Sequence, residues 1–127
     1  MSQKTLLWAG RIISGLVVLA LLADAASILT FPSSMQATFA ATGFPDNLAP
    51  TLGMIVLVCT VLFAIPRTAV LGAILLTGLL GGAICTHFRL GEIGSPPQII
   101  SLVLGALVWG ALYLRDARVK RLLPLTA

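Results

Sequence analysis

Apolar residues fill four long runs of this chain, and polar residues gather in the short segments between them. The runs cover residues 6–31, 48–65, 69–88 and 99–114. A helix of roughly 20 mostly apolar residues is long enough to cross the hydrocarbon core of a bilayer, which is about 30 Å thick. Because a chain in lipid has to satisfy its backbone polar groups internally, each run is expected to be an α-helix. The pattern therefore predicts four membrane-spanning helices.

The segments between the runs contain residues that end or begin helices. Residues 35–41 lie between Pro32 and Gly43 and are too few to span a membrane, so they predict a short helix in the outer interface. The connection Pro66-Arg67-Thr68 is short enough to make the second and third spans an antiparallel hairpin. Pro96-Pro97 is typical of a first helical turn and precedes the fourth span.

Together these features predict one transmembrane domain over residues 1–127. The predicted fold is all-α and polytopic. It is a four-transmembrane-helix bundle with a short interfacial helix between the first two spans and a basic tail over residues 115–127. The first run starts like a secretory signal, but it contains Arg11 and stays apolar beyond Ala25, so we expect an uncleaved first span.

The amino-acid composition is the one expected of a membrane-embedded protein. Charged residues make up 9% of the chain and hydrophobic residues 58%, whereas an ordinary soluble domain has about 25% charged residues. The mean hydropathy is +1.07. A soluble bundle of four buried helices would need a polar outer shell, which this composition cannot supply. The bilayer is therefore the expected surroundings.

The basic residues predict the orientation of the chain. Half of the eight basic residues directly follow the last run, at Arg115, Arg118, Lys120 and Arg121. Four spans place Lys4 and Arg67 on that same side and only Arg89 on the other. The positive-inside rule then puts both termini in the cytoplasm, in a bacterial cytoplasmic (inner) membrane. The net charge of +4 thus predicts no nucleic-acid partner, and a role in recognising anionic lipid is secondary.

Asp24 is the most informative polar residue, because it lies inside the first run. An intramembrane carboxylate costs about 2.5–3.5 kcal/mol on insertion scales, so Asp24 is expected to face the bundle interior, find a partner, or be protonated. Thr86, His87 and Arg89 end the third run, and Glu92 lies in the loop after it. A contact of Asp24 with His87 or Arg89 would create an outward-facing pocket between the first and third spans.

Two interpretations of this polar group remain open. It could bind the polar head of a small ligand such as a quinone carbonyl, with His87 exchanging the proton that quinone reduction requires. Alternatively, the same residues could only fix helix register and cap the outer face.

Small residues suggest where helices approach closely. Gly78 and Gly82 have the GxxxG spacing, which allows either packing within one bundle or a homodimer face. Cys59 and Cys85 are expected at different depths, which predicts no disulfide between them. We interpret both as small apolar residues.

Several chemistries are excluded by what the sequence lacks. One histidine cannot provide a bis-histidine haem, and there is no CxxCH. No His, Cys, Asp and Glu cluster has metal-site spacing, and no glycine-rich phosphate loop occurs. Without a CxxC there is no thiol pair for disulfide exchange. No metal site and no intrinsic cofactor are predicted, and a quinone remains a candidate ligand.

A set of short motifs extends over nearly the whole chain. They are Gly43-Phe44-Pro45, Leu52-Gly53, Ile65-Pro66-Arg67-Thr68-Ala69, Gly72-Ala73-Ile74-Leu75-Leu76-Thr77-Gly78, Gly81-Gly82-Ala83-Ile84, Thr86-His87, Arg89, Trp109 and Leu114-Arg115-Asp116. This set resembles the DoxX-like family of small four-helix membrane proteins. The resemblance implies a four-span bundle with cytoplasmic termini. It also implies a link to redox or sulfur metabolism, because the family takes its name from a subunit associated with thiosulfate:quinone oxidoreduction. It supplies no catalytic residues.

The first functional hypothesis is therefore a quinone- or redox-linked accessory subunit with a small pocket near the outer face. An alternative is a non-enzymatic scaffold or assembly factor that binds another membrane protein through the glycine-rich third span. A second alternative is a small transporter of a lipophilic compound, although a single four-helix unit lacks the inverted repeat usual in transporters. Whether the chain has any enzymatic activity stays open.

Overall fold

The structure is a computed structural model that describes residues 2–122. Within this range the chain forms helices and turns and no β-strand. The helices are α1 (Gln3–Thr30), the 3₁₀ helix η1 (Pro32–Met35), α2 (Gln36–Thr42), the 3₁₀ helix η2 (Asp46–Leu48), α3 (Ala49–Ala64), α4 (Ala69–Arg89), α5 (Pro96–Arg115) and α6 (Ala117–Leu122).

The four predicted spans correspond to α1, α3, α4 and α5. The fourth starts three residues earlier than its apolar run, because Pro96 and Pro97 occupy the first helical turn. By length and composition α1, α4 and α5 could each cross a membrane. With 16 residues, α3 is shorter and rises only about 24 Å. The all-α class is thus confirmed, and the four-span bundle stays a prediction.

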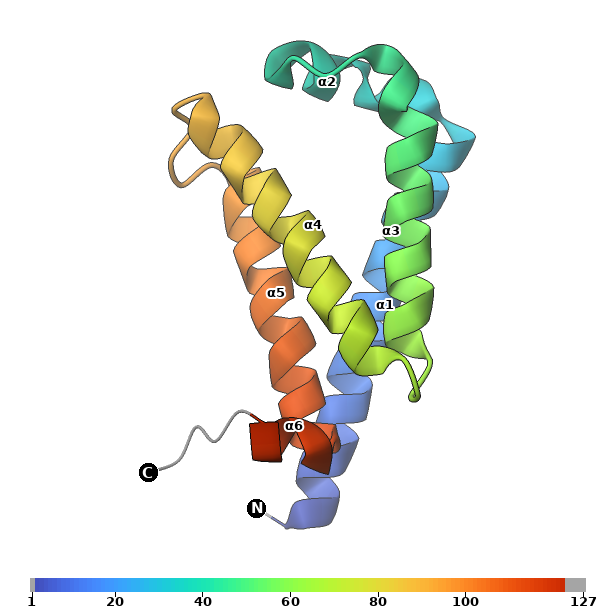
Figure 1. Ribbon diagram of the computed structural model, residues 1–127, viewed down its shortest axis with the longest axis vertical. Coiled ribbons are helices and arrows are strands. Elements are labelled where there is room, and N and C mark those ends of the chain that lie inside the picture. Colours follow the sequence, from blue (N-terminus) through green and yellow to red (C-terminus); the bar gives the residue numbers. More distant parts are fainter. Residues whose placement is uncertain (1, 123–127) are drawn as a thin grey trace.

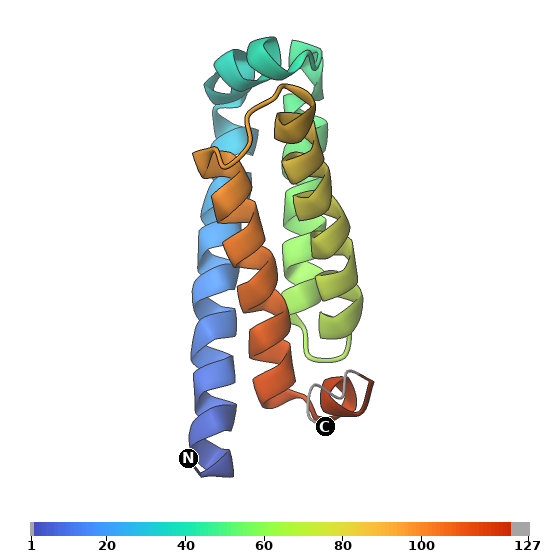
Figure 2. The same cartoon turned by 90° about the vertical axis from the view of Figure 1, so that its left-hand side faces the viewer.

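The four long helices form a ring of neighbours: α1 contacts α3, α3 contacts α4, α4 contacts α5, and α5 contacts α1 (Figures 1 and 2). From their short connection α3 and α4 diverge along their length (Figure 1). We call the end with α2 and loop residues 90–95 the α2 end. The opposite end, with the start of α1, the α3–α4 connection and α6, is the basic end.

Two apolar clusters hold these helices together. The larger one is built from all four long helices and α6, and its fully buried members include Phe63, Leu76 and Leu112. The smaller one joins Ile28 of α1, Phe39 of α2 and Ala49 of α3. This second cluster fixes α2 to α1 and α3. The C-terminal end of α4 packs on α5 instead and is not among the residues of this cluster.

The hairpin of α3 and α4 closes on a glycine. A Cβ atom at Gly72 would lie 2.6 Å from the Phe63 Cα and 2.7 Å from the Leu62 backbone carbon, so only glycine fits there. The Thr68 hydroxyl donates to the Leu62 carbonyl oxygen at 2.7 Å and fastens the same connection. The predicted antiparallel hairpin is confirmed, and backbone contact explains why it is tight.

The segment predicted as a basic tail contains a further short helix. Arg115 still belongs to α5, and residues 117–122 form the short helix α6; residues 123–127 lie outside the described residues. Val119 is 1% exposed and packs into the larger apolar cluster, and this contact holds α6 against the long helices. Asp116 starts this helix, because its Oδ1 accepts the Arg118 backbone N–H at 2.9 Å. The charge pattern indicated the tail and gave no sign of the buried valine.

Replacing Asp116 with alanine should loosen α6 by about 1 kcal/mol, the usual cost of losing a helix cap. The Arg118 side chain donates to Asp116, which holds the pKa of this carboxyl below its ordinary value. The stabilisation should therefore be complete above the ordinary pKa of about 4 and be lost as the pH falls through the lower folded pKa. Amide exchange at Val119, corrected for its intrinsic pH dependence, measures this. Lys120→Ala is the control, and equal protection in both variants would contradict the cap.

Candidate ligand-binding site at the α2 end

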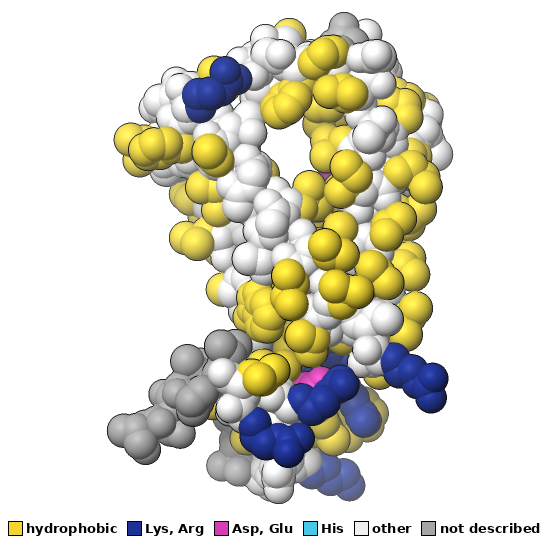
Figure 3. Space-filling model, in the orientation of Figure 1, with side chains coloured by type: hydrophobic (Ala, Val, Ile, Leu, Met, Phe, Trp, Pro, Cys, Tyr) yellow, Lys and Arg dark blue, Asp and Glu magenta, His cyan; other side chains and the backbone are white. Residues whose placement is uncertain are grey.

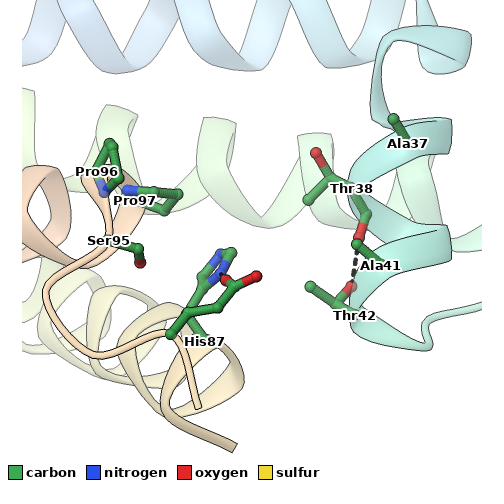
Figure 4. A pocket seen from close by; sticks show the side chains of 9 residues that line it. Ala37, Thr38, Ala41, Thr42, His87, Ser95, Pro96 and Pro97 are labelled. Atoms are coloured by element: carbon green, nitrogen blue, oxygen red, sulfur yellow. Dashed lines mark hydrogen bonds and ion pairs between the residues drawn. The ribbon is translucent and has the colours of Figure 1, made fainter. Parts of the chain in front are cut away.

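A cleft with a volume of about 600 Å³ opens at the α2 end of the molecule (Figure 4). One wall is α2, and the other is the end of α4 with the loop that leads into α5. The lining residues are Ala37, Thr38, Ala41 and Thr42 on the first wall and His87, Glu92, Ser95, Pro96 and Pro97 on the second. The cleft therefore lies between two parts of the chain that are far apart in the sequence.

An imidazole and a carboxylate form the chemical centre of the second wall. The Nδ1 atom of His87 lies 2.6 Å from the Oε2 atom of Glu92. The His87 side chain is 15% exposed and that of Glu92 45% exposed, so the pair borders the open space of the cleft. Since Nδ1 is engaged by the carboxylate, Nε2 is the ring nitrogen left for a ligand.

The end of α4 explains why these two side chains meet. Gly91 adopts φ +78°, a left-handed conformation that ends the helix. The backbone N–H of Glu92 then donates to the His87 carbonyl at 3.1 Å, and that of Gly91 donates to the Phe88 carbonyl at 2.9 Å. This is the Schellman arrangement, and it folds residue 92 back over residue 87. The spacing His-x-x-x-Gly-Glu is the sequence signal that predicts the pair.

One long side chain links the two walls. Arg89 Nη2 donates to the Thr42 carbonyl oxygen at 2.6 Å, at the C-terminal end of α2. A cation at this position satisfies a helix carbonyl that has no partner within α2. Gln98 fastens the loop, because its Oε1 accepts from the Gly94 N–H at 2.8 Å and its Nε2 donates to the Ile84 carbonyl at 3.0 Å. Our sequence reasoning missed Thr42, and it missed Gln98 because an isolated glutamine carries no pattern.

The structure corrects the predicted role of Asp24. Its side chain is exposed on α1, and within residues 2–122 it has no hydrogen-bond or ion-pair partner. The predicted contact with His87 or Arg89 is absent, because those residues bind Glu92 and Thr42 instead. Asp24 precedes the buried Ala25 and lies beside the packed face of α1 rather than on it.

Thr86 and the other predicted features are placed as follows. The Thr86 hydroxyl donates to the Gly82 carbonyl of its own helix at 2.8 Å and does not line the cleft. Trp109 donates from Nε1 to the Thr77 hydroxyl at 2.7 Å and links α5 to α4. Both cysteines are free thiols, Cys59 buried and Cys85 exposed. Among the side chains described, no three of His, Cys, Asp and Glu could hold a metal ion.

The predicted glycine face also has a definite position. In the described chain, a Cβ atom added at Gly78, Gly81 or Gly82 would have no neighbour within 4 Å. The expected packing of Gly78 and Gly82 inside the bundle is therefore not observed, and Gly72 makes the close contact of α4 instead. Much of the face of α4 that is turned to the viewer in Figure 3 is white, the colour of the backbone and of side chains that are neither hydrophobic nor charged.

Comparisons with known proteins provide one decisive finding. The sequence matches no curated protein and no solved structure. The family model of the DoxX-like family matches residues 12–111, which is most of the chain. The chain belongs to the DoxX-like family. The resemblance inferred from the motifs is thereby confirmed. In this DoxX-like protein both walls of the cleft lie inside the matched region, and family and apolar helices together identify a multi-pass membrane protein.

Proposed function

We propose that this DoxX-like protein binds the headgroup of a quinone in the cleft at the α2 end and serves as an accessory subunit of a redox complex. The observation that carries the proposal is the His87–Glu92 pair, joined at 2.6 Å in the wall of the cleft. The volume of about 600 Å³ is in the range of small-molecule sites. Because the surrounding helices are apolar and lie in lipid, a lipid-soluble ligand can reach the cleft from the bilayer.

The chemistry of the pair suits a ligand with a carbonyl oxygen. Reduction of a quinone to a quinol takes two electrons and two protons. His87 can donate a hydrogen bond, and during reduction a proton, from Nε2 to a carbonyl oxygen, while the Glu92 carboxylate holds the ring in place at Nδ1. A redox protein in the same complex would supply the two electrons, and water at the mouth of the cleft would supply the second proton. The contribution of this chain is thus binding, orientation and one proton-transferring group.

The proposal also includes an orientation in the membrane. At the basic end, described basic residues belong to the start of α1, the α3–α4 connection and α6, and they gather at the lower end in Figure 3. Under the positive-inside rule this end faces the cytoplasm of a bacterial inner membrane, with four spans and cytoplasmic termini. The cleft then opens on the outer side, where an extracytoplasmic redox partner could reach it.

Quinone retention tests the proposal. The purified protein is expected to retain quinone, measured by solvent extraction and chromatography. The double substitution His87→Ala and Glu92→Gln should lower the retained amount about tenfold, because it removes the charge-assisted contact. Asp24→Asn is the matched control, since Asp24 does not line the cleft. Retention by the double variant, or none in the unsubstituted protein, would overturn the proposal.

A second candidate function is favoured by one observation. The open face at Gly78, Gly81 and Gly82 leaves backbone exposed on α4 in the described chain. In lipid, helices associate through such close backbone approach rather than through a hydrophobic drive. A scaffold or assembly factor that packs a helix of another membrane protein on α4 is therefore the alternative to a quinone-binding subunit.

A further inference from the structure

Two arginines from different helices lie beside a close helix contact at the basic end of the molecule. Arg11 belongs to α1 and Arg115 to α5. The two helices approach closely at Gly10, where a Cβ atom would lie 2.8 Å from the Ala111 carbonyl oxygen and 3.1 Å from the Arg115 Cβ. Since Arg11 directly follows Gly10, this contact brings the backbones that carry the two arginines close together, and like charges at short range repel each other.

Arg115 is held in an unusual position for an arginine. Its guanidinium carbon lies 5.6 Å from the centroid of the buried Phe63 ring, below the larger apolar cluster. Its Nε is buried and has no hydrogen-bond partner in the described structure. A buried donor without an acceptor is costly, and more so when it carries charge. Arg11 stacks over Trp8 at 5.6 Å, an arrangement typical of the membrane interface.

No described carboxylate accepts a hydrogen bond from either of these two arginines. Asp116 is adjacent to Arg115, but its two oxygens accept from Arg118, with Nε at 3.2 Å and Nη2 at 2.9 Å. Glu92 is paired with His87 at the opposite end. Arg115 therefore keeps a buried donor without an acceptor, and a bound anion would supply one.

We propose that Arg11 and Arg115 form a binding site for the phosphate group of an anionic phospholipid in the leaflet at the basic end. Guanidinium groups suit this ligand because their fixed N–H donors match phosphate oxygens in pairs. The phosphate would accept from Arg115 and offset the repulsion with Arg11. Both residues lie outside the region that the family model matches. It is independent of the quinone proposal.

Lipid titration followed by native mass spectrometry tests the site. Phosphatidylglycerol, phosphatidylcholine and inorganic phosphate are added separately to the full-length protein in detergent. Phosphatidylglycerol should bind, and Arg11→Gln with Arg115→Gln should lower the bound fraction about tenfold. Lys120→Gln with Arg121→Gln removes the same charge from α6 at the same end and should change binding less than about twofold.

Each other outcome has a definite meaning. Equal losses in the two double variants would show a diffuse charge effect and overturn the site. Binding of inorganic phosphate as strong as that of phosphatidylglycerol would overturn the lipid assignment, and so would equal binding of phosphatidylcholine. If Arg115→Gln does not fold, Arg11→Gln alone decides, because Arg11 is exposed and is not part of the buried clusters. Unchanged lipid binding in that variant would refute the proposal.

Discussion

Replacing Gly72 with alanine is expected to destabilise the protein by about 3 kcal/mol, the upper part of the range for overpacked cores. The added methyl group would meet the backbone of α3, at 2.6 Å from the Phe63 Cα and 2.7 Å from the Leu62 carbon. Backbone atoms cannot rotate away as a flexible side chain would. The hairpin of α3 and α4 would have to open, and the larger apolar cluster would open with it.

The buried Cys59 gives a direct readout of this effect. It is 6% exposed, so a thiol-reactive dye should label it only when the helices separate on heating. The exposed Cys85 is replaced by serine to remove its signal. Gly78→Ala on the same helix is the matched control, because its added Cβ has no neighbour within 4 Å in the described chain. Similar midpoints for Gly72→Ala and Gly78→Ala would show that the close approach at Gly72 does not limit stability.

The second large effect concerns the open face of α4. If a partner helix packs there, replacing both Gly78 and Gly82 with leucine should abolish the complex in mild detergent, because the side chains keep the two backbones apart. The fold itself should survive, since a Cβ atom added at either position would have no neighbour within 4 Å in the described chain. Size-exclusion chromatography with mass determination measures the complex, and the Cys59 labelling midpoint checks the fold.

Glycines on other helices provide the control for this experiment. A Cβ atom at Gly15 on α1 or at Gly110 on α5 would also have no neighbour within 4 Å among the described residues. Replacing these two with leucine adds the same bulk away from the α4 face and should leave the complex intact. A complex that survives the Gly78 and Gly82 substitutions, or an unsubstituted protein that is a monomer, would refute the scaffold hypothesis.

The sequence predicted the elements well because lipid restricts the choices. Apolar length predicted α1, α4 and α5, and proline and glycine positions predicted the connections and the short helix after Pro32. The helix α6 was missed, because six residues with several charges show no apolar run. Val119 is its one buried side chain, and a single valine in a charged segment gives no recognisable pattern.

The candidate site was predicted in part, for a definite physical reason. His87, Arg89 and Glu92 lie near one another in the sequence, so local helix-ending geometry places them together. Asp24 is far from these residues in the sequence, and whether it lies near them in space depends on how α1 is rotated about its own axis. The cost of a charge in lipid predicts that Asp24 avoids acyl chains, but it does not specify the neighbour. Similarly, GxxxG spacing predicts close approach without saying whether the partner belongs to the same chain.

The two walls of the cleft are attached to different parts of the molecule. One hydrogen-bonded turn at the C-terminal end of α4 contains His87, Gly91 and Glu92, so this turn fixes their positions relative to one another. The facing wall follows α1 and α3 through the Phe39 contacts. Among the described side-chain hydrogen bonds, only the one from Arg89 to the Thr42 carbonyl oxygen joins the two walls of the cleft. The width of the cleft therefore depends on the angle between the α1–α3 pair and the C-terminal end of α4. A ligand that contacts both walls would favour one value of this angle.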